Sequence, residues 1–441
     1  MKFSWQALSK SSFIQDAFFT YLARGFCVLF GTLTTIVVSR AVGPEGRGWM
    51  ACALSLASFW FPIASFGLNI SNYVLGSKWI DKRPQLVSNS IYLSIVSTLL
   101  LSAIILPLEA LYPSVVPLPG IFLAGAIFYS FVLTLSGHFQ SLLFSFGKVR
   151  ICNWQEFCCR GLCLLSVTIL FLIHCQAASQ YFLIQAFILF LGVIFYSGVI
   201  WRFLGRFSQG SWQLFRTSAL CNFKGWLYTI AGSLFTMTDI FIISYLSGPA
   251  QVGYYNIAAA IVRNVFIIIP STLSQLLLPK LATSCKTIRD CLPRVRFLSL
   301  ILIVINLTLI ATLSLITPWL INFTVGPQFS PCVQVIYWIL PGAFFYAQYC
   351  MLGPLFNVAG CPYSTTVCYL VAVCADWTLC FLWGARGAIG AAQAFSCASG
   401  LLLLSALVQV GLYATTKLGD APLVMGENTP ELRPELTQLE S

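Results

Sequence analysis

The stretch Thr35–Ala57 reads TIVVSRAVGPEGRGWMACALSLA, and it predicts two apolar helices joined by a turn at Gly43-Pro44-Glu45-Gly46-Arg47-Gly48. Residues 240–262, IFIISYLSGPAQVGYYNIAAAIV, repeat this arrangement near the middle of the chain. Aligning the two stretches places Ser39 on Ser244, Gly43-Pro44 on Gly248-Pro249, Gly48 on Gly253 and Ala53 on Ala258. Because internal repeats are the usual construction of membrane transporters, the shared frame predicts a duplicated architecture.

The composition excludes an ordinary soluble domain. Charged residues make up 8% of the 441 residues and hydrophobic residues 58%, whereas soluble domains are roughly 25% charged. A hydrocarbon core of about 30 Å needs about 20 apolar residues per helix, and apolar runs of this length recur along the chain between short polar turns. We therefore expect a polytopic membrane protein with an all-α fold.

The apolar runs predict about twelve transmembrane helices in two six-helix halves. In the first half we expect helices at 17–39, 49–70 and 86–106, one ending near 144, one at 154–173 and one ending near 201. In the second we expect helices at 225–246 and 254–278, two ending near 316 and 358, one at 364–384 and one ending near 413. The predicted organisation is a six-helix bundle at 1–205, a cytoplasmic linker at 206–224, a second bundle at 225–414 and a disordered cytoplasmic tail at 415–441.

Successive predicted loops lie on alternate sides of the membrane, and the basic residues gather in the loops of one side. With the N-terminus inside, the predicted cytoplasmic segments hold 18 Lys and Arg residues, and the opposite side holds only Arg40, Arg47 and Arg386. Cytoplasmic loops of membrane proteins carry an excess of Lys and Arg, so both termini are expected in the cytoplasm. Lys2 and Lys10 precede the first apolar run without a small-residue cleavage pattern, which predicts an uncleaved signal anchor.

Motifs for enzymatic or metal chemistry are missing from the sequence. The 17 Cys residues mostly fall inside apolar segments and form no C-x2-C pair, so no metal site is expected. Neither a Ser/His/Asp order nor a phosphate-binding glycine loop is present. His138 and His174 are isolated near predicted helix ends and are assigned no role. The sequence therefore predicts neither an enzyme nor a cofactor.

The candidate functional residues are ionisable side chains inside apolar helices, because each is expensive there unless it is paired or faces water. Arg24 either snorkels to the cytoplasmic surface or faces a cavity. Asp239 and Asp376 lie too deep for their short side chains to reach a surface, and each has either a structural or an ion-coupling role. Arg263 is positioned to pair with Asp239 across the second hairpin.

Glu156 and Arg160 are the remaining charged pair within a predicted helix. They are spaced i,i+4 with the acid first, an arrangement in which the two charges neutralise each other on one helix face. This spacing predicts a local ion pair, and the alternative is a function for each charge separately.

Three stretches together resemble the polysaccharide transporter (oligosaccharide flippase) family. They are the Ser39–Gly48 turn, the segment from Asp239 to Ala258, and Gly387-Ala388-Ile389-Gly390-Ala391-Ala392. This family includes the O-antigen flippases of the Wzx type and belongs to the multidrug/oligosaccharidyl-lipid/polysaccharide (MOP) superfamily. The resemblance implies two six-helix halves around a central cavity, as in the multidrug and toxin extrusion (MATE) transporters.

The resemblance also implies a function. The expected activity is alternating-access transfer of an undecaprenyl-diphosphate-linked oligosaccharide across the bacterial inner membrane, for O-antigen, lipopolysaccharide or other polysaccharide biosynthesis. Arg24, Arg263 and Arg160 would receive the anionic substrate, and Asp239, Asp376 and Glu156 would couple protons or sodium or pair with the arginines. Gly43, Pro44, Gly46, Gly48, Gly248, Pro249 and Gly253 would form the turns or hinges. Membrane lipids, a polysaccharide polymerase and chain-length machinery are the expected partners, and nucleic acid is not.

Three alternatives stay open at this point. A MATE-type antiporter would export organic cations, but the intramembrane acids and bases here are equal in number. A lipid II flippase usually carries two further C-terminal helices. A scaffold for glycan-assembly enzymes would transport nothing, and the deep carboxylates of Asp239 and Asp376 count against it.

Overall fold

The structure is a computed structural model that describes residues 12–113, 118–205, 208–284, 287–358 and 362–415. Its regular structure in these ranges is helical, which confirms the predicted all-α fold. A helix satisfies its backbone N–H and C=O groups internally, as the hydrocarbon core of a membrane requires. In the described part of the chain, ten helices are long and apolar enough to cross a bilayer.

The chain divides into two compact units, each described here by itself. Unit 1 comprises Met1–Trp226 together with Gly248–Gly253 and Thr324–Gln328. Unit 2 comprises Leu227–Ser247, Tyr254–Phe323 and Phe329–Ser441. The N-terminal residues 1–11, which include the expected signal-anchor lysines, and residues 416–441 of the expected tail lie outside the described residues.

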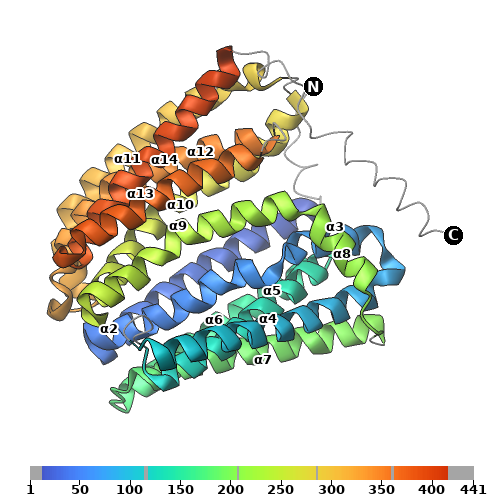
Figure 1. Ribbon diagram of the computed structural model, residues 1–441, viewed down its shortest axis with the longest axis horizontal. Coiled ribbons are helices and arrows are strands. Elements are labelled where there is room, and N and C mark those ends of the chain that lie inside the picture. The colour runs from blue at the N-terminus through green and yellow to red at the C-terminus, as the bar shows by residue number, and fades with distance from the viewer. Residues whose placement is uncertain (1–11, 114–117, 206–207, 285–286, 359–361, 416–441) are drawn as a thin grey trace. The chain divides into compact units, whose positions relative to one another are not determined.

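Unit 1 is a bundle of long helices with two short ones (Figure 1). Its helices are α2 (Ser12–Ser65), α3 (Leu68–Lys78), α4 (Arg83–Leu111), α5 (Gly120–Ser145), α6 (Val149–Leu172), α7 (Ala178–Leu204) and α8 (Trp212–Cys221). The core between α3, α4, α5 and α7 is made by apolar side chains such as Leu75, Val87, Val132, Leu142 and Tyr196, all at most 4% exposed.

Helix α2 is 54 residues long and reverses direction at Gly43, where the backbone leaves helical geometry with φ 69° and ψ −176°. Before this point, Phe26 packs on Phe157 of α6 with ring centroids 5.9 Å apart. Beyond it, Phe61 lies against Gly137 of α5. Because α5 and α6 form a hairpin through residues 146–148, Phe157 and Gly137 lie at similar depth, so the two arms of α2 run antiparallel.

Three predicted boundaries in this region are wrong. The expected six-residue turn is only one residue long, since Pro44 already belongs to the second helical arm. Proline is tolerated at the start of a helix because it lacks an N–H where an N–H would have no helical acceptor. The helix expected at 49–70 ends at Ser65, because Phe66 and Gly67 adopt positive φ, and α3 follows. The segment expected as a loop around Lys78 is therefore largely helical.

The predicted linker at 206–224 contains α8, which is fastened to unit 1. The Ser211 side chain caps this helix by accepting the Leu214 N–H at 3.3 Å. Asn89 of α4 donates to the Ser211 carbonyl at 3.0 Å and accepts the Ser211 N–H at 2.9 Å. The first half of the linker therefore follows unit 1 rather than connecting the halves as free chain.

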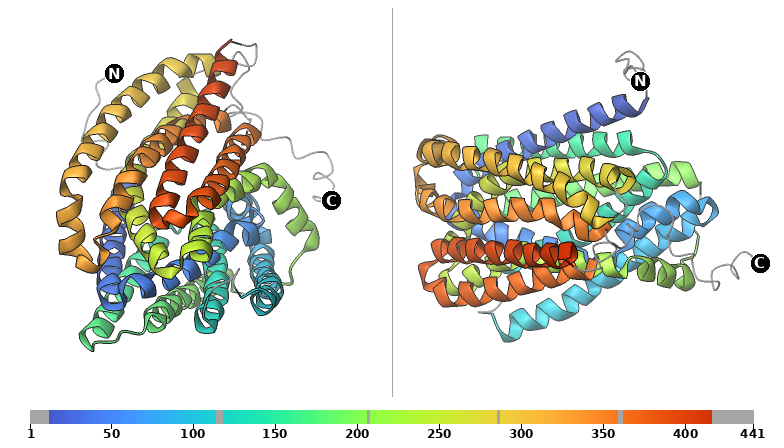
Figure 2. Two further views of the ribbon diagram at one scale, coloured as in Figure 1. Left: turned by 60° about the vertical axis from the view of Figure 1, so that its left-hand side comes forward. Right: turned by 90° about the horizontal axis from the view of Figure 1, so that it is seen from above.

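Unit 2 contains most of α9 (Phe223–Ser247) and α10 (Pro249–Ser284), with α11 (Ile288–Thr324), α12 (Cys332–Val358), α13 (Pro362–Trp383) and α14 (Ala388–Thr415). Helix α14 packs against both α12 and α13, and Figure 2 shows these helices running alongside one another. Helix α10 is 36 residues long, enough to cross a membrane. Counting α10 and both arms of α2, the described residues contain the twelve membrane-length helices that the sequence predicts.

Candidate functional site

The candidate site is a cluster of charged side chains inside unit 2, centred on Asp239. This residue lies near the middle of α9 and is fully buried. Its Oδ1 accepts the N–H of Ile240 at 2.9 Å, and its Oδ2 accepts a hydrogen bond from the Tyr255 hydroxyl on α10. The reversal at Gly248 between α9 and α10 brings these two side chains together. A buried carboxylate held by two donors is fixed in position.

Arg263, two turns beyond Tyr255 on α10, provides the positive charge of the cluster. Its Nη2 lies 3.9 Å from Asp239 Oδ2, with the side chains 22% and 0% exposed respectively. This is an electrostatic pair without a hydrogen bond, because the separation exceeds hydrogen-bonding distance. The guanidinium also lies over the ring of Phe395 on α14, 5.9 Å from its centroid, as a cation–π contact. The pairing that the sequence offered as an alternative for Arg263 is therefore present.

Asp376 of α13 is the second carboxylate of the cluster and is fully buried. It interacts electrostatically with both Asp239 and Arg263, and its Oδ2 has no hydrogen-bond partner. The neighbouring Trp377 donates from Nε1 to Thr238 Oγ1 at 2.7 Å, which ties α13 to α9 beside Asp239. The cluster therefore holds two carboxylates to one guanidinium, and one carboxylate oxygen is available to a cation or a proton.

Aromatic rings surround the apolar side of this cluster. Phe235 of α9 packs on Tyr346, Tyr369 and Phe395, with ring centroids 5.7–5.9 Å apart. These side chains come from α12, α13 and α14 and exclude water from one side of the charges. Charges interact more strongly where water is excluded, so the cluster is a strong electrostatic site.

The sequence singled out Asp239, Arg263 and Asp376 but not Tyr255. A signal was present, since Tyr255 and Asp239 lie at similar distances on either side of Gly248, and Tyr255 shares a face of α10 with Arg263 at spacing i,i+8. The assignment was missed because a tyrosine in an apolar helix is by itself unremarkable. Phe395 carried no recognisable signal, because only the packing of α14 brings it under Arg263.

The other sequence candidates lie in unit 1. Arg24 on α2 and Arg160 on α6 are exposed, and Glu156 is half-buried. Glu156 and Arg160 both interact electrostatically with Cys27, one turn beyond Arg24, so the three charges occupy one neighbourhood of α2 and α6. The ion pair expected from the i,i+4 spacing of Glu156 and Arg160 stays a prediction.

The Gly-Pro turns are structural in both copies. Gly43 and Gly248 have φ of 69° and 81°, a region that glycine enters without strain. A Cβ on Gly48 would overlap the carbonyl of Pro249, and one on Gly253 would overlap the carbonyl of Pro44. This reciprocal contact within unit 1 explains why both copies keep the second glycine. Gly46 has a different reason, since a Cβ there would meet Val42 and Ala178.

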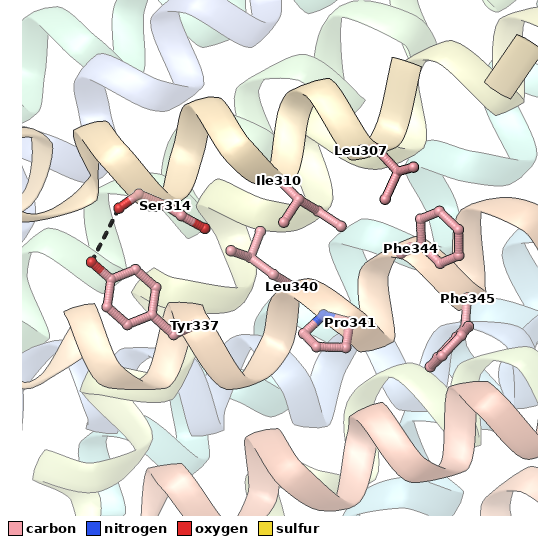
Figure 3. A pocket seen from close by; sticks show the side chains of 8 residues that line it. All are labelled: Leu307, Ile310, Ser314, Tyr337, Leu340, Pro341, Phe344 and Phe345. Carbon is pink, nitrogen blue, oxygen red and sulfur yellow. Dashed lines mark hydrogen bonds between the residues drawn. The ribbon is translucent and has the colours of Figure 1, made fainter. Parts of the chain in front are cut away.

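An apolar groove lies between α11 and α12 in unit 2 (Figure 3). Its volume is about 550 Å³, and Tyr337 bridges it by donating to the Ser314 carbonyl at 3.1 Å. The lining carries no charged group and consists of Leu307, Ile310, Ser314, Tyr337, Leu340, Pro341, Phe344 and Phe345. At membrane depth, such a surface suits a hydrocarbon chain. Among the described residues, no cluster of three His, Cys, Asp or Glu side chains is arranged to hold a metal.

The fold places the chain in a known class of membrane protein. The structure of the lipid II flippase MurJ in an inward closed conformation matches with a TM-score of 0.72 and 13% identity, covering 96% of this chain and 95% of that chain. An inward-facing multidrug resistance MATE family transporter of the MOP superfamily matches with a TM-score of 0.69 and 14% identity, covering 88% and 95%. No curated protein sequence matches the chain. The class is thus a multi-pass membrane protein with the fold shared by these transporters.

The sequence supplies the family. A family model described as polysaccharide biosynthesis protein matches residues 13–284, which is more than half of the chain. The chain therefore belongs to the polysaccharide biosynthesis protein family. The resemblance drawn from the three sequence stretches is confirmed.

Proposed function

We propose that the protein is a flippase that transfers a lipid-linked oligosaccharide, with an undecaprenyl-diphosphate carrier, across the bacterial inner membrane by alternating access. The observation that carries the proposal is the buried cluster of Asp239, Arg263 and Asp376 in a polysaccharide biosynthesis protein. Ionisable side chains inside a membrane mark substrate or ion pathways by default. A scaffold for glycan-assembly enzymes would not need two buried carboxylates.

The charges divide into two roles in this proposal. The unit 2 cluster is acidic overall, so it takes the coupling cation, a proton or sodium, with Arg263 holding Asp239 and Asp376 in place. Arg24 and Arg160 in unit 1 are exposed and keep their charge available. Arginine binds diphosphate groups well because its planar fork of donors matches the phosphate oxygens. These two arginines are therefore the proposed contacts for the anionic head group.

The hydrocarbon part of the substrate needs no polar site. The groove between α11 and α12 offers an uncharged surface beside the cluster-bearing helices of the same unit. Burying each CH₂ group of a lipid contributes about 0.8 kcal/mol. The tail thus stays among apolar side chains and lipid while the sugar crosses. The expected cellular context is O-antigen or other polysaccharide assembly, with a polymerase and chain-length machinery as further partners and both termini in the cytoplasm.

Reconstitution tests this function directly. Purified protein is placed in proteoliposomes that contain undecaprenyl-diphosphate-linked oligosaccharide in both leaflets, and a membrane-impermeant glycosidase is added outside. Without flipping, only the outer-leaflet sugar is cleaved, whereas a flippase makes the inner pool accessible with time. We expect Arg24→Ala and Asp239→Asn to slow the cleavage of the inner-leaflet sugar by roughly tenfold or more. This factor corresponds to the loss of a charge-assisted contact.

Arg386→Ala is the matched control, because this exposed arginine bonds only locally, to Gln393 Oε1 at 3.0 Å. It should flip substrate at the parental rate. An inner pool that stays protected with the parent protein would contradict the flippase assignment. Uptake of an organic cation in the same vesicles, driven by sodium or protons, would instead identify an antiporter. Normal flipping by Arg24→Ala at equal protein levels would remove this arginine from the head-group site.

A further inference from the structure

Helix α8 is a surface helix of unit 1 that the proposed function does not use. It packs against α3 and α4, and Figure 1 shows it beside α3. Asn89, which bonds Ser211 at the start of α8, lies less than two turns into α4. Leu214 and Ser218 are at most 6% exposed, and Ser71 of α3 donates to the Ser218 carbonyl at 2.6 Å. One side of α8 is therefore fixed against unit 1, and the other side is free.

The free side of α8 combines large apolar side chains with a cation. Trp212 and Leu220 are 76% and 65% exposed, and Arg216 between them is also exposed. The three residues follow one another at spacing i,i+4, so they lie on one side of the helix. Exposed Trp and Leu together with a basic residue are typical of helices at the boundary between hydrocarbon and lipid head groups. This side of α8 therefore fits a membrane surface better than bulk water.

An apolar groove of about 280 Å³ lies between α8 and α4. Trp212 and Phe215 line it from α8, with their rings stacked at a centroid distance of 5.3 Å. Tyr92 and Val96 line it from α4 and are 55% and 59% exposed. The exposed side of α4 continues to Leu99, which is 64% exposed. The groove is thus continuous with the apolar side of a membrane-length helix, and an acyl chain that covers this side can enter it.

Three basic side chains at the same end of unit 1 lie over aromatic rings. The pairs, with distances of 4.4–4.9 Å to the ring centroids, are Lys82 on Trp79, Arg83 on Phe146 and Lys148 on Phe203. These contacts join the starts of α4 and α6 to the ends of α5 and α7, so these helix ends lie together. An aromatic ring orients a cation without cancelling its charge. The positive charges therefore stay available to a ligand.

Acidic side chains do not balance this charge. Asp81 is the only acidic residue in the segments 66–85, 146–150 and 201–224. Arg216 forms no ion pair with any residue that the structure describes. A positively charged surface beside an apolar groove is complementary to a lipid whose head group carries negative charge.

We propose that α8 and the neighbouring part of α4 form a binding site for an anionic phospholipid of the bilayer. One acyl chain lies in the groove along Tyr92 and Val96, and Arg216 binds the phosphate of the head group through its planar fork of donors. A zwitterionic phospholipid presents the same phosphate with a cation attached, so the basic surroundings favour the anionic lipid. The site is separate from the carboxylate cluster of unit 2, and the inference does not depend on the proposed flippase activity.

Photo-cross-linking in lipid nanodiscs tests this site. Purified full-length protein is placed in nanodiscs in which a phospholipid with a diazirine in one acyl chain carries either a phosphatidylglycerol or a phosphatidylcholine head group. After irradiation, peptide mass spectrometry locates the labelled residues. We expect phosphatidylglycerol to label Tyr92, Val96 and Phe215 roughly fivefold more than phosphatidylcholine, the factor expected for one basic residue near an anionic lipid surface. The uncharged groove between α11 and α12 is the internal control and should label equally with both lipids.

Two exposed positions provide the variants. Arg216→Gln should remove the excess labelling by phosphatidylglycerol and leave that by phosphatidylcholine unchanged. Val96→Trp fills the groove and should lower the labelling of Phe215 by both lipids. Arg386→Gln is the matched control, because this exposed arginine of unit 2 bonds Gln393, and it should keep the excess.

Equal labelling by the two lipids in the parent protein would overturn the proposal. An excess that survives Arg216→Gln, or labelling of Phe215 that survives Val96→Trp, would overturn it as well. The nanodiscs contain no lipid-linked oligosaccharide, so a failed flipping assay would leave this result standing.

Discussion

The two Gly-Pro hairpins share a backbone but not their chemistry. Both reverse at a glycine with positive φ followed by proline, at Gly43-Pro44 and Gly248-Pro249. In the second hairpin, Tyr255 donates a hydrogen bond to Asp239, and Arg263 forms an electrostatic pair with it. In the repeat alignment, the same three positions in the first hairpin are Thr34, Met50 and Ser58, none of them charged.

This difference separates residues kept for geometry from residues kept for chemistry. A turn between two membrane-spanning helices needs a glycine at the reversal and another at the close backbone approach, whatever the helices do. A buried charge is useful in only one copy, because each additional one requires its own partners. The two hairpins therefore share their turns and differ in the charges that their helices carry.

The largest expected effect tests the shared geometry. Gly48→Ala and Gly253→Ala should each destabilise the protein by at least about 3 kcal/mol, because the new Cβ overlaps a backbone carbonyl that cannot move aside as a side chain would. Yield of monodisperse protein and the thermal unfolding temperature measure this. Gly31→Ala on α2, with nothing within 4 Å of the added Cβ, is the control and should be neutral or stabilising. If the two substitutions destabilised the protein by clearly different amounts, the reciprocal contact would not explain both glycines.

The next effect tests the charge cluster that only the second hairpin carries. Asp239→Asn removes the carboxylate that lies 3.9 Å from Arg263 and should cost about 2 kcal/mol in unfolding free energy. Adding Arg263→Gln should restore part of that loss, since the unpaired charge is then gone. The four unfolding temperatures of this double-mutant cycle give the coupling energy. Strictly additive effects would show that the two side chains do not interact.

A smaller effect concerns the hydrogen bond within the cluster. Tyr255→Phe removes the hydroxyl that donates to Asp239 Oδ2 but keeps the ring, and should cost about 1.5 kcal/mol, as for a hydrogen bond to a charged group. Thermal unfolding of the purified variant provides the measurement. Repeating the substitution in Asp239→Asn should reduce its effect, and an undiminished cost would mean that the hydroxyl acts elsewhere.

The smallest effect is expected at the matching position of the first hairpin. Met50 is fully buried, and Met50→Leu conserves volume without removing a polar contact, so it should change stability by less than about 1 kcal/mol. Flipping activity should stay at the parental level. A loss of activity as large as that of Asp239→Asn would show that the first hairpin takes part in the chemistry after all.

Much of the fold follows from the sequence because a bilayer restricts the secondary structure that a spanning segment can adopt. Apolar runs of about 20 residues must be helices, and the twelve expected ones are present in the described residues. The predicted helix boundaries were wrong where the local backbone geometry sets the end of a helix. The end of α2 at Ser65 depends on positive φ at Phe66 and Gly67, and a phenylalanine in that conformation has no signature in the sequence.

The candidate site was predicted in part for a similar reason. Asp239, Arg263 and Asp376 were recognisable because an ionisable residue in an apolar run is conspicuous by itself. Helical spacing permits an ion pair between Glu156 and Arg160 but does not by itself require one, so this pairing stays a prediction.

The sequence by itself determined that this is a duplicated, all-helical membrane protein with a few deep charges, because hydropathy and spacing are properties of the chain alone. The tertiary structure decided which charges meet. Asp239, Tyr255 and Asp376 come from three helices. Hydrogen bonds and ion pairs act over a few ångströms, so they depend on positions that only the packed helices define.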